Sequence, residues 1–287
     1  MNETQGENRM SWLRATLIDV GWGDSILLES EDDYGTHHFA LIDSNDTASF
    51  RSSYIFLRRY FERKKINIFA PNRSFEWVLL THAHADHGQG LKRILKDFGS
   101  DRFWYPEPAN PPTFFVDLLR YSANPQNRRV GQCDIIHSNR ILPSFGNAKM
   151  DVLWPPAQLL PLNENNNSVV LSIGLGNVSF VFTGDAEADG VWSHISGAIP
   201  VNTRFFKVPH HGADNGMFES NGNTPWLSVL PSGAEVAISS HVQPFSHPST
   251  RVLSVLQSQR LIYRTDEHFH VAIETDGQSV SVTYSHI

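Results

Sequence analysis

The sequence predicts an α/β fold of four layers, in which two β-sheets stack face to face and helices cover the outer surfaces. Runs typical of strands occur in both halves of the chain, and in each half strands come first and a helical pattern follows. No Gly/Ser-rich linker or change in composition divides the 287 residues, a length that can bury a complete core. We therefore expect one domain over residues 1–287.

The first half begins as a β-meander. Leu13, Ala15 and Leu17 alternate with Arg14 and Thr16, which is typical of a half-buried strand. Gly21 and Gly23 then interrupt the pattern. The expected elements are strands at 13–19, 25–29, 39–42 and 77–80, an amphipathic helix at 48–65, and a helix that starts near Gly88 or Gly90 and contains Leu91, Ile94 and Leu95.

Residues 101–145 give no regular pattern. Pro106, Pro108, Pro111 and Pro112 interrupt this stretch, and aromatic residues are frequent in it. We expect an irregular insertion with one short helix near 113–122, because long irregular segments in compact domains are often lids or binding loops.

The second half returns to strands and closes with a helix and two more strands. The expected strands are 151–154, 169–173, 178–183, 205–208, 236–239, 269–274 and 279–283, with a helix after Ser249.

Composition narrows the class of protein. The formal net charge of −7 disfavours tight non-specific binding of duplex nucleic acid, which depends on Lys and Arg. Cys133 is the only cysteine, the N-terminus has no apolar signal segment, and no run approaches 18 apolar residues. We expect a soluble cytoplasmic protein that does not enter the membrane.

One short segment concentrates metal-binding side chains. His82, His84, Asp86 and His87 fall within six positions directly after the apolar run at 77–80. Two histidines two positions apart project to the same side of an extended segment. Imidazole and carboxylate suit Zn²⁺, with Mn²⁺ or Fe as alternatives, and this arrangement could serve two divalent ions.

This His-X-His-X-Asp-His pattern resembles the signature of the metallo-β-lactamase superfamily. Further motifs resemble one branch, the hydrolase domain of the competence protein ComEC and its stand-alone relatives. The matching segments are 19–25 (DVGWGDS), 41–43 (LID), 166–170 (NNSVV), 182–185 (FTGD), 207–212 (KVPHHG), 247–248 (HP) and 263–266 (YRTD).

The resemblance implies the αββα metallo-β-lactamase sandwich and a set of ligands. His82 and His84 would bind a first metal, Asp86 and His87 a second, and Asp185 would bridge the two. We expect His210 rather than His211 to complete the second site, with His211 near the substrate.

Two departures from the family pattern stand out. Many members supply a third histidine to the first metal, where this chain has Asn165–Asn167, so a single tightly bound metal is an alternative. Trp22 replaces a glutamine of the branch, which is explained either by tolerance in a loop or by an altered pocket wall.

Other polar residues are expected to support the site or the reaction. Carboxylates at strand ends often orient ligand imidazoles, so Asp43 and Asp19 are candidates for that role, and Asn167 for a similar one. The catalytic candidates, besides Asp86, are His211 and His247 for proton transfer and Lys207 for holding a phosphate oxygen.

The expected activity is hydrolysis by a metal-bound hydroxide, most simply of a phosphodiester in a nucleotide or single-stranded nucleic acid. The basic residues between Arg51 and Lys65, Arg128 and Arg129, and the aromatic residues of 101–145 could bind such a substrate. One alternative is hydrolysis of a lactone, β-lactam or thioester. Another is a metal-bearing module that acts only with a partner protein.

Overall fold

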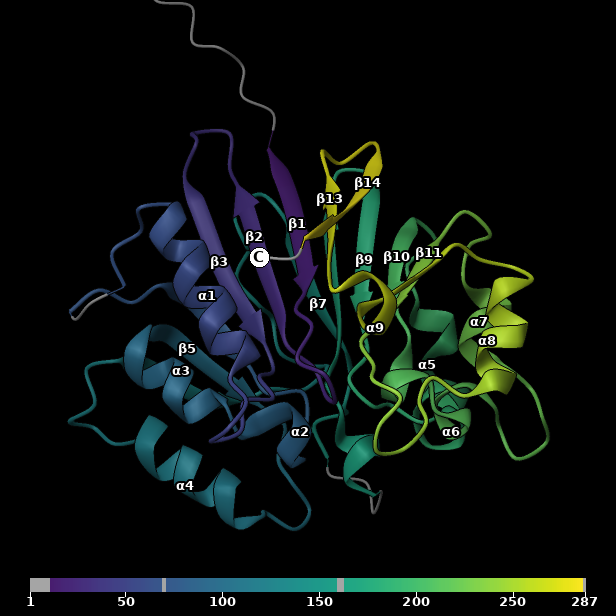
Figure 1. Ribbon diagram of the computed structural model, residues 1–287, viewed down its shortest axis with the longest axis horizontal. Helices are drawn as coiled ribbons and strands as arrows, with labels where there is room; N and C mark the ends of the chain where they lie inside the picture. Colours follow the sequence, from purple (N-terminus) through teal and green to yellow (C-terminus); the bar gives the residue numbers. More distant parts are fainter. Residues whose placement is uncertain (1–10, 69–70, 159–162, 286–287) are drawn as a thin grey trace, which may run out of the picture.

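Two mixed β-sheets stack face to face in the computed structural model, which describes residues 11–68, 71–158 and 163–285 (Figure 1). The eight-stranded sheet has the order β14-β13-β1-β2-β3-β4-β5-β6. Its strands are β1 (Trp12–Leu17), β2 (Ile26–Glu31), β3 (His37–Ile42), β4 (Phe75–Leu79), β5 (Ser100–Tyr105), β6 (Val130–Ile135), β13 (His270–Thr275) and β14 (Val280–Ser285). The six-stranded sheet has the order β12-β11-β10-β9-β8-β7. Its strands are β7 (Lys149–Trp154), β8 (Val170–Leu175), β9 (Val178–Phe182), β10 (Thr203–Lys207), β11 (Glu235–Ile238) and β12 (Ile262–Arg264).

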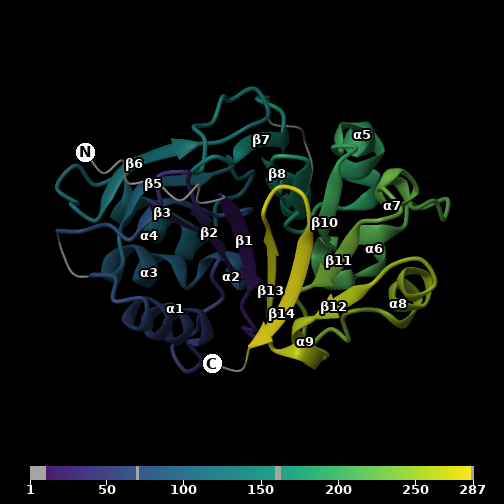
Figure 2. The ribbon, with the colours of Figure 1, turned by 90° about the horizontal axis from the view of Figure 1, so that it is seen from above.

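Helices cover the outer face of each sheet, as Figure 2 shows from above. The first sheet carries α1 (Ser52–Arg63), α3 (Leu91–Asp97) and α4 (Thr113–Ser122), with the short α2 (Ala85–Gly88) at one end. The second carries α5 (Ser193–Ile195), α6 (Asp214–Met217), α7 (Pro225–Val229) and α8 (Thr250–Gln257), and α9 (Thr265–His268) precedes β13. Single turns form η1 (Glu164–Asn167), η2 (Ala188–Trp192), η3 (Ser196–Ala198) and η4 (Pro209–Gly212). The predicted four-layer fold is confirmed. Within the residues described, no helix has the length and apolar character needed to cross a membrane.

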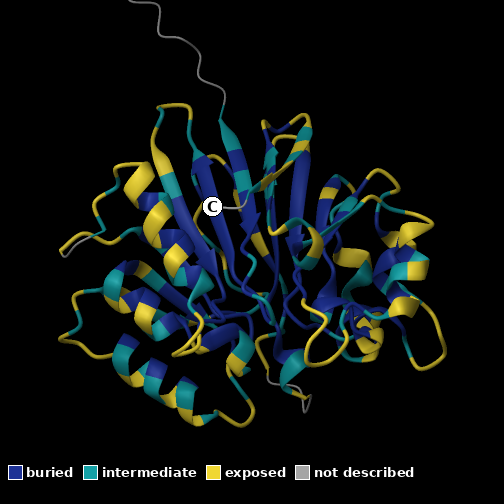
Figure 3. Ribbon diagram, in the orientation of Figure 1, coloured by how far each residue is buried: buried dark blue, intermediate teal, exposed yellow. Residues whose placement is uncertain are grey.

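Helix α1 is shorter than the predicted 48–65 because a side chain from outside it satisfies its first turn. The carboxylate of Asp46 accepts hydrogen bonds from the backbone N–H groups of Ser53 and Tyr54, at 2.9 and 2.8 Å. These N–H groups have no partner within a helix, so Asp46 fixes where the helix begins. Phe56 and Phe61 of this helix are buried, whereas Arg58, Arg59 and Arg63 are exposed. Figure 3 shows the alternation of buried and exposed positions along α1.

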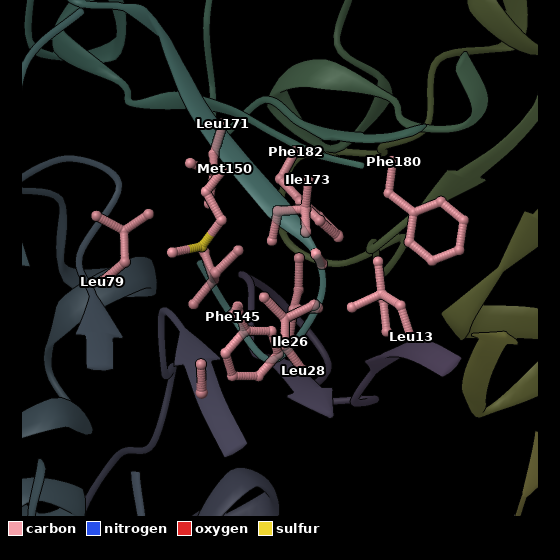
Figure 4. Close-up of a cluster of buried hydrophobic side chains, with 14 of the residues drawn as sticks. Leu13, Ile26, Leu28, Leu79, Phe145, Met150, Leu171, Ile173, Phe180 and Phe182 are labelled. Atoms are coloured by element: carbon pink, nitrogen blue, oxygen red, sulfur yellow. The ribbon is translucent and has the colours of Figure 1, made fainter. Parts of the chain in front are cut away.

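The core between the sheets explains the alternating sequence of the strands (Figure 4). Leu13, Ile26 and Leu28 from the first sheet pack in one cluster with Leu171 and Phe180 from the second, all fully or almost fully buried. The central strands are buried on both faces, which produces the apolar runs seen in the sequence.

The expectation of an irregular insertion over 101–145 is wrong in part. Strands β5 and β6 pair in parallel and extend the first sheet, while α4 lies where a helix was predicted. Trp104 stacks on Trp77 in the core, with ring centroids 5.3 Å apart. Strand β6 was not predicted from the sequence, because this edge strand (VGQCDI) mixes polar and apolar residues.

The parallel strands bring functional segments to one end of the sandwich. Strand β3 pairs in parallel with β4, and β9, β10 and β11 are parallel in the second sheet. The segments after these strands therefore meet at the carboxyl ends of the strands, where α2 lies at the lower centre of Figure 1. These segments contain the histidine and aspartate motifs.

Candidate metal centre

The segment after β4 places the histidine motif between the two sheets. His82 and His87 are fully buried, and Asp86 is partly exposed. The Nε2 atom of His82 lies 3.0 Å from Nδ1 of His84, so the two imidazoles face the same space, as their spacing predicted. Asp86 and His87 lie in α2, immediately beside this pair.

Asp185 is the centre of the cluster. It follows β9, and its backbone N–H donates to the hydroxyl of Ser168 at 2.9 Å. Its Oδ2 atom lies between 3.3 and 3.9 Å from the Nε2 atoms of four histidines. These histidines are His82, His87, His210 and His211.

The segment after β10 supplies two adjacent histidines through an unusual backbone. His210 and His211 both have left-handed φ angles, 49° and 52°. Each such residue costs about 1–2 kcal/mol relative to the right-handed form. The paired turn directs both imidazoles toward Asp185, where an extended segment would send them to opposite sides.

His211, rather than the expected His210, belongs to a compact group of four potential ligands. One ligand atom from each of Asp86, His87, Asp185 and His211 lies within 4.8 Å of every other. Nδ1 of His211 donates to the backbone oxygen of Ser239 at 2.8 Å, which turns Nε2 toward Asp86 and Asp185. His210 reaches only the outer side of Asp185, at 3.9 Å.

Asp43 supports His87 as expected. Its Oδ2 atom accepts from Nδ1 of His87 at 2.7 Å, and the N–H and hydroxyl of Thr81 donate to its two oxygens. A metal-ligating histidine commonly donates its other N–H to a carboxylate in this way. The contact leaves Nε2 of His87 free to face Asp185.

Lys207 was expected to hold a phosphate oxygen of the substrate. The structure contradicts this role, because the side chain is fully buried. Its Nζ atom lies 2.8 Å from Oδ2 of Asp24, another buried residue. The carboxylate of Asp24 lies 3.7 Å from Nδ1 of both His87 and His211. The Lys207–Asp24 ion pair therefore lies on the Nδ1 side of two of the imidazoles, those of His87 and His211.

Asp19 and Asn167 have roles different from the expected ones. The Asp19 carboxylate accepts from the N–H of Gly21 at 3.0 Å and so shapes the loop before β2, rather than orienting an imidazole. Asn167 donates to Glu164, which in turn accepts from the backbone N–H of Ala83. Asn167 thus supports the histidine segment indirectly, through a glutamate that the sequence did not single out.

The electrostatics of the site favour positive charge. Burial alone would lower the pKa of His87, but Asp185, Asp43 and Asp86 raise it well above its ordinary value. Burial also opposes protonation of His211, yet Asp185 and Asp24 raise the pKa of His211 to about 10. Among the described residues, Nε2 of His87, Nε2 of His211 and Oδ1 of Asp185 are buried without a hydrogen-bond partner. Converging donor atoms in such a field fit divalent cations, so these residues suit a binuclear metal site.

A pocket of about 840 Å³ opens onto this centre. His84, Asp86, Asp185 and His210 contribute to its floor. His247 also lines the pocket, with its ring centroid 6.1 Å from that of His210.

The basic residues of 51–65, Arg128 and Arg129, and the aromatic residues of 101–145, which are expected to bind nucleic acid, do not line this pocket. Arg129 donates to backbone carbonyls that include Lys96 and Ile68, so it holds loops together. Phe103 and Trp104 are buried in the cores. The aromatic residues that line the pocket are instead Trp22, Phe50 and Phe245, together with histidines.

Comparisons with known proteins agree with this fold and site. The family model of the metallo-beta-lactamase superfamily matches residues 14–221. ComE operon protein 3 of Bacillus subtilis (strain 168) is 24% identical over 261 residues, which cover 88% of this chain and 32% of that protein. The chain thus spans about a third of the length of this relative, and the match confirms the resemblance to the ComEC-type branch.

Solved structures show more distant similarity. A long-form RNase Z from yeast matches 84% of this chain and 38% of its own, with 13% identity and a TM-score of 0.44. The flavodiiron protein from Giardia intestinalis matches 60% of this chain and 38% of its own, with 16% identity and a TM-score of 0.34. Because the family model covers most of the chain, and the histidine–aspartate cluster lies where its motif predicts, this protein belongs to the metallo-β-lactamase superfamily.

Proposed function

We propose that this metal-dependent hydrolase is a phosphodiesterase. The observation that carries the proposal is the central position of Asp185, whose Oδ2 atom lies within 4 Å of four imidazole nitrogens. A carboxylate shared in this way suits two adjacent cations. Paired cations of this kind are typical of phosphatases and nucleases, where they stabilise the attacking and the leaving oxygen of an in-line displacement.

The proposed ligand assignment divides the cluster around Asp185. His82 and His84 would hold the first cation. Asp86, His87 and His211 would hold the second. Two divalent ions bound there, Zn²⁺ or Mn²⁺, would make a water molecule acidic enough to act at neutral pH and would stabilise charge on the substrate oxygens.

The protein itself would position the substrate and move protons. His247 lines the pocket, so its imidazole is the residue proposed to pass a proton to the leaving oxygen. Lys207 would keep His87 and His211 in place through Asp24 rather than bind the phosphate.

Hydrolysis of a lactone or another carbonyl ester is the second candidate. It is favoured by the lining of the pocket, which contains no Lys or Arg among the described residues. A neutral ester needs no such cation, whereas a diester would rely on the bound metal ions to balance its charge.

The deciding experiment compares three substrates with the same preparations. Bis-p-nitrophenyl phosphate, a lactone and a β-lactam are offered to chelator-treated protein reloaded with Zn²⁺ or Mn²⁺. The isosteric variant Asp185→Asn serves as the control, and bound metal is counted in every sample. Diester cleavage that needs metal and falls sharply in Asp185→Asn supports the proposal. Turnover of the lactone or β-lactam alone, or metal-loaded protein that cleaves nothing, contradicts it.

A further inference from the structure

We propose that the pocket binds a small phosphodiester through a flat aromatic or heteroaromatic group, which stacks on an aromatic wall formed by Trp22, Phe245 and Phe50. This inference rests on the proposed phosphodiesterase function and defines its substrate class. It predicts a nucleotide-sized diester rather than a long nucleic acid.

Trp22 is fixed close to the metal centre. Its backbone oxygen accepts a hydrogen bond from the side-chain amide of Asn45. The neighbouring Gly23 has a φ of 106°, and a Cβ atom there would lie 2.2 Å from the backbone oxygen of Asp86. The loop therefore packs directly against α2. The ring centroid of Trp22 lies 4.8 Å from that of His211.

Phe245 continues the wall away from the metal centre. Its ring centroid is 4.6 Å from that of Trp22, and its side chain is 60% exposed although it lines the pocket. Phe50 also lines the pocket, is 55% exposed, and lies next to Gly21, the residue that precedes Trp22. Exposed aromatic faces inside a pocket beside a reactive centre are suited to stacking on a planar group of the substrate.

The charge of the pocket limits the length of the substrate. Among the described lining residues there is no Lys or Arg, and two carboxylates, Asp86 and Asp185, lie on the floor. Proteins bind polynucleotides largely by neutralising backbone phosphates with Lys and Arg side chains. The exposed arginines of α1, such as Arg58 and Arg59, do not line this pocket. A substrate with one phosphodiester at the metal centre and one flat group on the wall matches these properties.

Binding measurements test the inference separately from catalysis. Thymidine 5′-monophosphate and methyl phosphate carry the same kind of phosphate, and calorimetry on the metal-loaded protein gives the affinity for each. The variants Trp22→Leu and Phe245→Ala remove rings, Trp22→Phe keeps one, and Tyr34→Ala removes an aromatic ring that is 93% exposed and outside the pocket.

We expect the thymidine nucleotide to bind about tenfold more tightly or better, an advantage lost in Trp22→Leu and Phe245→Ala. Trp22→Phe should recover most of it, and Tyr34→Ala should leave it unchanged. Equal affinity for both phosphates, or an advantage that persists without the rings, would overturn the inference.

A kinetic arm uses p-nitrophenyl diesters of thymidine 5′-phosphate and of methyl phosphate, which share a leaving group. A higher kcat/KM for the thymidine ester supports the aromatic wall. Efficient cleavage of the methyl ester with no preference overturns the wall and leaves the phosphodiesterase intact. Preferential cleavage of a 20-nucleotide single strand over the thymidine ester would refute the small substrate. If neither ester is cleaved, the proposed function fails. The binding affinities still test whether the aromatic wall binds a flat group.

Discussion

The two segments that supply the histidines of the metal centre reach the same geometry in different ways. After β4, His82 and His84 are two positions apart, and an ordinary extended backbone directs both to one side. After β10, His210 and His211 are adjacent, and only a pair of left-handed residues brings both toward Asp185. The first arrangement can be read from spacing, and the second cannot.

The residues that hold the histidines of the two segments in place also differ. His87 is held by Asp43, which follows β3, and His211 by a backbone oxygen after β11. The carboxylate of Asp24, in the buried Lys207–Asp24 pair, lies near Nδ1 of both imidazoles. Each half of the site is therefore stabilised by residues from distant parts of the chain.

The largest effect should distinguish His211 from His210. His211→Ala removes a member of the compact group, so we expect loss of one bound metal ion per chain and a fall in kcat on the order of 100-fold or more, since a metal ion contributes several kcal/mol. His210→Ala should retain both ions at saturating metal. Metal counting by mass spectrometry decides between them, and the reverse pattern would restore His210 as the ligand of the second site.

Breaking the buried ion pair should have the next largest effect. Lys207→Met leaves the Asp24 carboxylate buried without its partner, and we expect the free energy of unfolding to fall by about 3–5 kcal/mol. The exposed pair Lys92–Asp117, with side chains 45% and 49% exposed, provides the control: Lys92→Met should change stability by at most about 1 kcal/mol. Urea denaturation of the metal-free proteins measures both. Equal losses of stability in Lys207→Met and Lys92→Met would contradict the inference that the buried pair stabilises the fold more than the exposed pair does.

Asp43 and Asp19 offer a matched pair of carboxylates. Asp43→Asn weakens the support of His87 and should reduce metal affinity by about 10- to 100-fold. The carboxylate of Asp19 accepts a hydrogen bond from the loop N–H of Gly21, so Asp19→Asn should leave the affinity unchanged. Titration with a competing chelator gives the two values, and a loss in Asp19→Asn of equal size would contradict this division of roles.

The pH dependence of stability should differ between the metal-free and the metal-loaded protein. The pKa of His211 is raised to about 10 in the folded, metal-free protein, against about 6.5 in the unfolded chain. A raised pKa stabilises the protein fully below pH 6.5, and this contribution is lost as the pH rises toward 10. Metal binding displaces the same proton, so metal affinity should rise over that interval.

Thermal denaturation of chelator-treated protein between pH 6.5 and 9.5 measures this loss. His211→Gln, which cannot hold the proton, should flatten the decline. A wild-type stability that rises with pH over this interval would show that His211 is neutral in the metal-free fold.

The local pattern of this sequence determined much of the fold. Alternating and apolar runs located most strands, because each strand buries one or both faces, and helical spacing located α1, α3, α4 and α8. It did not reveal β5 and β6 as sheet strands. Polar Gln132 and Asp134 at the sheet edge and the prolines between β5 and α4 obscured the pairing that places Trp104 against Trp77.

For the metal centre, four residues could be predicted from their spacing in one continuous segment: His82, His84, Asp86 and His87. Everything that depends on contacts between distant segments became visible only in the folded structure. The folding placed His211 rather than His210 beside Asp86, withdrew Lys207 into a buried pair with Asp24, and built a pocket wall from Trp22, Phe50 and Phe245. The physical reason is that direction along one segment follows from backbone geometry, whereas burial and partnership follow from how the two sheets pack.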